Sequence, residues 1–106
     1  MSVMYYILKD KKPIPCEDIL ELAEWYKSPN RFLKKDKAAD YTISTIFLGI
    51  DLNHRDKGDP ILFETLVTTD DLENKVEIDR YCTWEEAMNG HERLLNKYTD
   101  LPNSAN

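Results

Sequence analysis

Several features that would assign a protein to a class are missing from this chain of 106 residues. No apolar run approaches the roughly 18 residues that cross a membrane. The first charges follow the N-terminal apolar stretch, which is the reverse of a secretory signal. There is no CxxC motif and no cysteine–histidine cluster with zinc spacing, so we expect no metal site and two reduced thiols, Cys16 and Cys82. We therefore predict a cytoplasmic protein without a cofactor.

The chain also lacks an excess of positive charge. Fourteen lysine and arginine residues stand against twenty acidic residues, which gives a net charge of −6. Because a phosphate backbone attracts the opposite sign, we expect no direct binding to nucleic acid and none to a membrane surface. A nucleic-acid role would require mimicry or a local basic patch. The acidic runs are typical of solvated faces and helix starts, with DNA mimicry as the alternative.

The size and composition indicate one globular unit. Hydrophobic residues make up 42% of the chain and charged residues 32%, which is ordinary for a globular protein. A chain of this length can bury one modest core without disulfides. We predict a single domain over residues 1–98 and a flexible tail over residues 99–106.

Five stretches are predicted to be strands, although the second is weak. They are VMYYIL (3–8), an edge strand RFLKK (31–35), YTISTIFLGI (41–50), ILFETLVT (61–68) and VEIDRYC (76–82). The stretch 41–50 is the clearest because it is rich in β-branched and aromatic residues and contains no proline. The last three strands have short connections, which favour antiparallel neighbours.

Two stretches are predicted to be helices. Residues 17–27 place Ile19, Leu22, Ala23 and Tyr26 at helical spacing. The sequence TWEE at 83–86 is a capping box that starts a helix of four turns. Its apolar face comprises Trp84, Ala87, Met88, His91, Leu94, Leu95 and Tyr98. Gly90 inside this helix hints that another backbone passes close by, since glycine costs roughly 1 kcal/mol there.

Together these elements predict an α+β fold. We expect a single domain with a three- to five-stranded antiparallel meander sheet and two packed helices.

The loop GIDLNHRDKGDP (49–60) carries the densest group of charged residues. Asp51 and His54 could act as a base or bind metal, and Arg55 could bind an anion. The loop does not fit a calcium-binding loop, because Asp56 stands where glycine is needed. It also lacks a GxxxxGK[ST] phosphate loop and any serine or cysteine nucleophile. A polar crossing between two strands and a ligand-binding loop both remain open.

Two further residues break apolar faces. Glu64 lies between Leu62 and Leu66, so its carboxylate should be paired or should face a ligand, and Arg80 on the next strand is a plausible partner. His91 lies on the apolar helix face, where it is either a hydrogen-bonded structural residue or a base at the helix–sheet junction.

The segments STIFLGID, PILFET and RYCTWEEAMNGHERLL occur in this order. The chain thereby resembles a group of small uncharacterised proteins encoded by bacteriophages and prophages, whose pattern is STVFLGLDH, PPLLFET and RYxTWEEAxxGHE. The resemblance covers roughly residues 42–95. The matched positions are Asp51, Pro60, Phe63, Glu64, Thr65, Tyr81, Thr83, Trp84, Glu85, Gly90 and His91. The loop departs from the pattern, because the histidine follows Asp51 by three residues.

The resemblance implies a phage accessory protein in the host cytoplasm. Small acidic phage proteins without catalytic motifs often act by binding a host protein or a signalling nucleotide used in host defence. We therefore expect a non-catalytic inhibitor of host defence, as a homodimer. The alternatives are a minor virion or packaging component and a small nucleotide hydrolase. The candidate ligand- or partner-binding residues are Asp51, His54, Arg55, Glu64, Arg80, Trp84 and His91.

Overall fold

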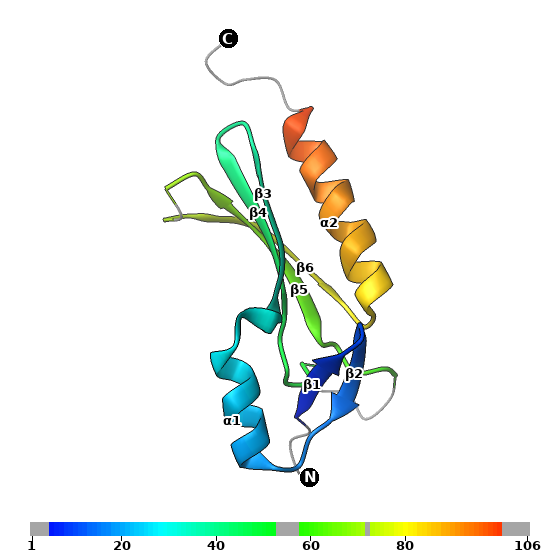
Figure 1. Cartoon of the computed structure of the whole chain (residues 1–106). Coiled ribbons are helices and arrows are strands. Elements are labelled where there is room, and N and C mark those ends of the chain that lie inside the picture. The colour runs from blue at the N-terminus through cyan, green and yellow to red at the C-terminus, as the bar shows by residue number, and fades with distance from the viewer. Residues whose placement is uncertain (1–4, 53–57, 72, 101–106) are drawn as a thin grey trace.

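Four antiparallel strands, joined in sequence order, form the main sheet of this computed structural model (Figure 1). The structure describes residues 5–52, 58–71 and 73–100. The sheet has the order β3-β4-β5-β6, and a separate hairpin pairs β1 with β2. The elements are β1 (Tyr6–Lys9), β2 (Lys12–Pro15), α1 (Ile19–Lys27), the 3-10 turn η1 (Pro29–Arg31), β3 (Phe32–Ala38), β4 (Tyr41–Phe47), β5 (Phe63–Thr69), β6 (Lys75–Tyr81) and α2 (Trp84–Thr99). The predicted α+β meander with two helices is confirmed.

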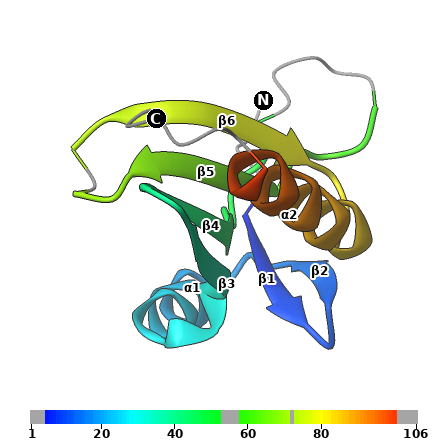
Figure 2. The ribbon, with the colours of Figure 1, turned by 90° about the horizontal axis from the view of Figure 1, so that it is seen from above.

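The long helix α2 covers one face of the main sheet. It contacts all four strands, and Figure 2 shows it on one side of the sheet. The predicted capping box starts it: the Glu86 amide donates to the Thr83 hydroxyl at 3.1 Å, and the Thr83 amide donates to the Glu86 carboxylate at 3.1 Å. Its buried residues are Ala87, Gly90, His91, Leu94 and Tyr98. The helix ends at Thr99, and residues 101–106 of the predicted tail lie outside the described part.

The hairpin β1–β2 was only half predicted, because KDKKP was interpreted as a turn alone. Lys9 and Lys12 pair, so Asp10 and Lys11 form a two-residue turn. Both turn residues have positive φ, 49° and 69°, as a tight hairpin turn of type I′ requires. Prolines at 13 and 15 argued against a strand there. They are tolerated because β2 is an edge strand, where an outward position needs no donated hydrogen bond.

Helix α1 lies at the end of the sheet opposite the β3–β4 and β5–β6 turns (Figure 1). It begins at Ile19, since the Asp18 carboxylate caps it by accepting from the Leu20 amide at 3.0 Å. The expected buried positions at Ile19 and Ala23 were wrong, because both side chains are exposed. Leu22 is buried instead, with Trp25 and Tyr26 partly buried beside it.

The central strand β4 ends three residues earlier than predicted. Gly49 has φ +76°, which is left-handed backbone that glycine adopts without strain. A Cβ at this position would lie 2.1 Å from the Tyr26 hydroxyl oxygen, and that hydroxyl donates to the Leu48 carbonyl. The chain therefore leaves the sheet here, and α1 is fastened to the departing segment.

Two clusters of buried side chains lie between α2 and the sheet. One is centred on Ala38, Ile43, Val67, Leu94 and Tyr98. The other contains Phe47, Leu62, Phe63 and Ala87, with Trp25 of α1 and Trp84 of α2 packed against it. Within the described residues, no helix is long and apolar enough to span a membrane.

Gly90 provides room for a side chain rather than for a backbone. The expected close backbone was wrong: a Cβ at Gly90 would lie 2.1 Å from the Tyr81 hydroxyl oxygen and 2.3 Å from two of its ring carbons. Tyr81 at the end of β6 thus lies directly against α2. Two positions of the phage-protein pattern therefore depend on one steric contact.

We expect Gly90→Ala to destabilise the protein by about 1–2 kcal/mol. Overpacking costs roughly 1–3 kcal/mol, and the gain in helix propensity of about 1 kcal/mol offsets only part of it. Urea unfolding measures the difference. The matched control is Asn89→Ala on the exposed face of the same helix, which should leave stability unchanged or slightly raised. Equal or higher stability of Gly90→Ala would contradict the contact.

Candidate functional site

A chain of polar side chains is buried between α2 and the sheet. His91 is 0% exposed; its Nε2 lies 2.8 Å from the Asp36 carboxylate and its Nδ1 lies 2.7 Å from the Thr45 hydroxyl. The Thr45 hydroxyl lies 2.6 Å from the Thr65 hydroxyl, its direct neighbour across β4 and β5. We call Asp36, Thr45, Thr65 and His91 the histidine cluster.

One arrangement of hydrogens satisfies the whole histidine cluster. Nε2 of His91 donates to Asp36, its Nδ1 accepts from Thr45, and Thr45 accepts from Thr65. A buried polar group without a partner costs roughly 1–3 kcal/mol, so this linkage makes the hydroxyls and the imidazole compatible with an apolar interior. The histidine cluster fixes the position of α2 on the sheet.

The histidine cluster has the residue types of an acid–base–nucleophile triad but not the access. A nucleophile must reach its substrate within about 3 Å, and Thr45, Thr65 and His91 are all 0% exposed. No substrate can approach them while α2 is in place. The geometry therefore supports the structural interpretation of His91.

Ion pairs on both sides of the histidine cluster tie α2 to the outer strands. Lys34 of β3 pairs with Glu92, and Arg93 pairs with Asp79 of β6. Glu77 of β6 accepts from Lys97 at 2.8 Å and from the Tyr98 hydroxyl at 2.7 Å. The hydrogen bond from Lys97 and then that from Tyr98 lower the pKa of Glu77. Burial, followed by the contact with Glu77, raises the pKa of Tyr98 to about 12.

The predicted pairing of Glu64 with Arg80 is confirmed. The two residues are cross-strand partners, and Arg80 Nε donates to the Glu64 carboxylate at 3.1 Å. Successive residues of a strand point to opposite faces. Because Thr65 faces α2, Glu64 faces away from it, and so Glu64 and His91 do not share a pocket.

No helix in the described part of the chain covers the face on which Glu64 lies, and we call this the open face. Strand pairing arranges its side chains in three rows across the sheet. The rows are Lys37, Thr42, Thr68 and Lys75; Lys35, Ser44, Leu66 and Ile78; and Phe32, Ile46, Glu64 and Arg80. Four cations therefore stand against two carboxylates, Glu64 and Asp70 of the β5–β6 turn, on a chain whose net charge is −6.

Two neighbouring hollows lie at the β3 side of the sheet, one on the open face and the other reaching around the β3 edge to Lys34, which pairs with Glu92 of α2. One, of about 260 Å³, is lined by Lys35, Thr42, Ser44, Leu66 and Thr68. The other, of about 350 Å³, is lined by Phe32, Leu33, Lys34, Lys35 and Ser44. Lys35 and Ser44 line both, so the two hollows adjoin. Among the described residues, Lys35 has no ion-pair partner.

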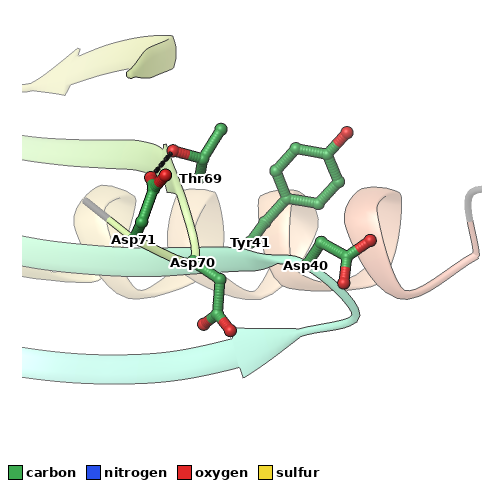
Figure 3. Close-up of a pocket in the computed structure, with 5 residues that line it drawn as sticks. All are labelled: Asp40, Tyr41, Thr69, Asp70 and Asp71. Carbon is green, nitrogen blue, oxygen red and sulfur yellow. Dashed lines mark hydrogen bonds between the residues drawn. The ribbon is translucent and has the colours of Figure 1, made fainter. Parts of the chain in front are cut away.

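A third hollow, of about 460 Å³, lies at the turns that join β3 to β4 and β5 to β6 (Figure 3). Two of its three carboxylates are already engaged: Asp70 pairs with Lys37 at 2.9 Å, and Asp71 accepts from the Thr69 hydroxyl and the Glu73 amide. The Thr69 hydroxyl, and then the Glu73 amide, lower the pKa of Asp71. Within the described ranges, no three histidine, cysteine or acidic residues are grouped to hold a metal ion.

Two other candidate residues that the structure describes, Asp51 and Trp84, lie apart from the histidine cluster and the open face. The Asp51 carboxylate accepts from the Ile61 amide at 2.9 Å and so joins the two ends of the polar loop. His54 and Arg55 lie outside the described residues. Trp84 is half-buried at the start of α2, and the Lys11 ammonium lies 4.5 Å from its ring centroid. Of the candidate residues that are described, the structure brings only Glu64 and Arg80 together.

Sequence reasoning missed the partners of His91 and the cations of the open face. Thr45 and Thr65 each interrupt the apolar alternation of a strand, and this was the signal that a polar cluster faces His91. Asp36 and Lys37 escaped because the edge strand was expected to stop at residue 35, whereas β3 continues to Ala38. Comparison of the chain with known protein families, curated protein sequences and solved structures found no match.

We expect Thr45→Val to lower the free energy of unfolding by roughly 1–3 kcal/mol, because it leaves His91 Nδ1 and the Thr65 hydroxyl without a partner. Denaturant unfolding measures the loss. The control is the double variant Thr45→Val/Thr65→Val, which removes both hydroxyls and should cost less than the two single variants together. Strict additivity would show that the two threonines are not coupled.

Proposed function

We propose that this chain is a small non-catalytic phage accessory protein that acts by binding an anionic host molecule on the open face. The observation that carries the proposal is the charge of that face, where four cations stand against two carboxylates, Glu64 and Asp70, and Lys35 has no ion-pair partner among the described residues. A local field of this sign attracts an anionic partner even though the net charge opposes one. The phage origin rests on the resemblance in sequence.

Binding is favoured over catalysis by the placement of the acid–base residues. His91 is buried on the side of α2 that faces the sheet, and Glu64 lies on the opposite face of the sheet in an ion pair with Arg80. A hydrolase would need these side chains to converge on one substrate. The hydrolase alternative therefore loses support.

The apolar residues of the open face also support a binding role. Ile78 is 41% exposed, while Ile46 and Leu66 are half-buried. Apolar side chains bordered by cations suit a binding surface. A partner can bury the apolar centre, and the cations at the rim attract an anionic partner. A symmetric homodimer remains part of the proposal, since β3 and β6 are the two outer strands of the sheet.

The test is affinity purification of the tagged chain from its bacterial host, with mass spectrometry of the proteins and small molecules that it retains. We expect the variant Lys35→Glu/Lys75→Glu to retain about tenfold less of an anionic partner than the unchanged chain does. The reason is that the two substitutions reverse the charge of the open face.

The control, Lys9→Glu/Lys12→Glu, makes the same charge change on the β1–β2 hairpin and should retain the partner. Equal retention by the two double variants would overturn the open face as the binding surface. Conversion of the retained molecule by the purified chain would overturn a non-catalytic role.

A further inference from the structure

The two adjoining hollows differ in chemistry along β3. At one end lies Phe32, whose side chain is 61% exposed. At the other lie the exposed Lys35 ammonium and the half-buried Ser44 hydroxyl, above a floor that includes the buried Thr42 and Thr68. An exposed ring offers a stacking surface, and an ammonium with a neighbouring hydroxyl offers donors for phosphate oxygens.

The ring of Phe32 is held from one side by a cation. The Arg31 guanidinium lies 5.0 Å from the Phe32 ring centroid and 5.5 Å from the Tyr26 ring centroid, so it is in contact with both aromatic residues. No carboxylate among the described residues pairs with Arg31, and its Nε is buried without a hydrogen-bond partner there. Arg31 lines neither hollow, so its role is to hold the Phe32 ring that does.

We propose that these two hollows bind a nucleotide, with the base stacked on Phe32 and the phosphates at Lys35 and Ser44. This inference rests on the proposed function and names its ligand class. The hollows, of about 350 and 260 Å³, are on the scale of a small-molecule site, roughly 300–1,000 Å³. Charge complementarity selects an anion over a second copy of the chain, because two such basic faces would repel each other.

The different chemistry of the two hollows predicts which part of a nucleotide each residue recognises. Stacking on Phe32 requires a base and no phosphate, whereas Lys35 and Ser44 require phosphate and no base. A nucleotide should therefore bind more tightly than either fragment. Exposed side chains that line neither hollow should have no effect.

The experiment is isothermal titration of the full chain with ADP, pyrophosphate and adenosine at low ionic strength, where exposed charges are least screened. We expect ADP to bind about tenfold more tightly than pyrophosphate, in line with stacking of one base. Phe32→Ala should remove this advantage and leave pyrophosphate unchanged, whereas Phe32→Tyr should restore it. Lys35→Ala should weaken ADP and pyrophosphate alike by about tenfold.

Lys12→Ala on the β1–β2 hairpin is the charge control and should bind like the unchanged chain. Thermal melts should show all variants folded, since Phe32, Lys35 and Lys12 are exposed. Equal affinity for ADP and pyrophosphate, unaffected by Phe32→Ala, would overturn the nucleotide and leave an anion-binding face. A second result would also overturn the nucleotide proposal. If no probe binds but a host protein is retained through Lys35 and Lys75, the proposed function stands and its ligand is not a nucleotide.

Discussion

The burial of His91 between α2 and the sheet fixes where α2 lies and which face of the sheet it covers. A neutral or charged imidazole placed at 0% exposure needs a partner at each nitrogen, and Asp36 and Thr45 supply them. Those partners come from two strands, so the contact sets the position of α2 against both. The apolar side chains around His91 then pack in one alignment of α2 against the sheet.

Because α2 covers one face of the sheet, the open face is left without a helix over it in the described part of the chain. The alternation of each strand sends Ile43, Thr45 and Phe47 into the core and Thr42, Ser44 and Ile46 to the open face. Most carboxylates of β6 face α2, where Glu77 and Asp79 pair with Lys97 and Arg93. The ion pairs that hold α2 thus withdraw negative charge from the open face and leave it basic.

The fold class and the last helix were predictable from local signals. The Thr83–Glu86 capping box and the apolar spacing after it specify α2 without tertiary information, and alternation specifies β4 and β5. The strand β2 was not predictable, because its prolines argue against a strand unless the position is known to be an edge. The buried stripe of α1 was also missed, since its inward side is decided by the few neighbours at the end of the sheet.

The candidate site was less predictable than the fold. Sequence reasoning paired Glu64 with Arg80 correctly, because they lie on consecutive antiparallel strands. It placed His91 on the apolar helix face but could not supply Asp36, which comes from a strand far away in the sequence. The basic open face was hidden by the net charge of −6, since a total carries no information on which residues share a face.

The most direct measurement compares methyl groups on the two faces of the same strands by carbon–proton NMR as pyrophosphate is added at low ionic strength. The account predicts shifts at the open-face methyl groups of Thr42, Ile46 and Leu66, and unchanged signals from Ile43, Val67 and Leu94 in the core between α2 and the sheet. Shifts of equal size in that core, or shifts there alone, would contradict the claim that this protein binds its partner on the open face.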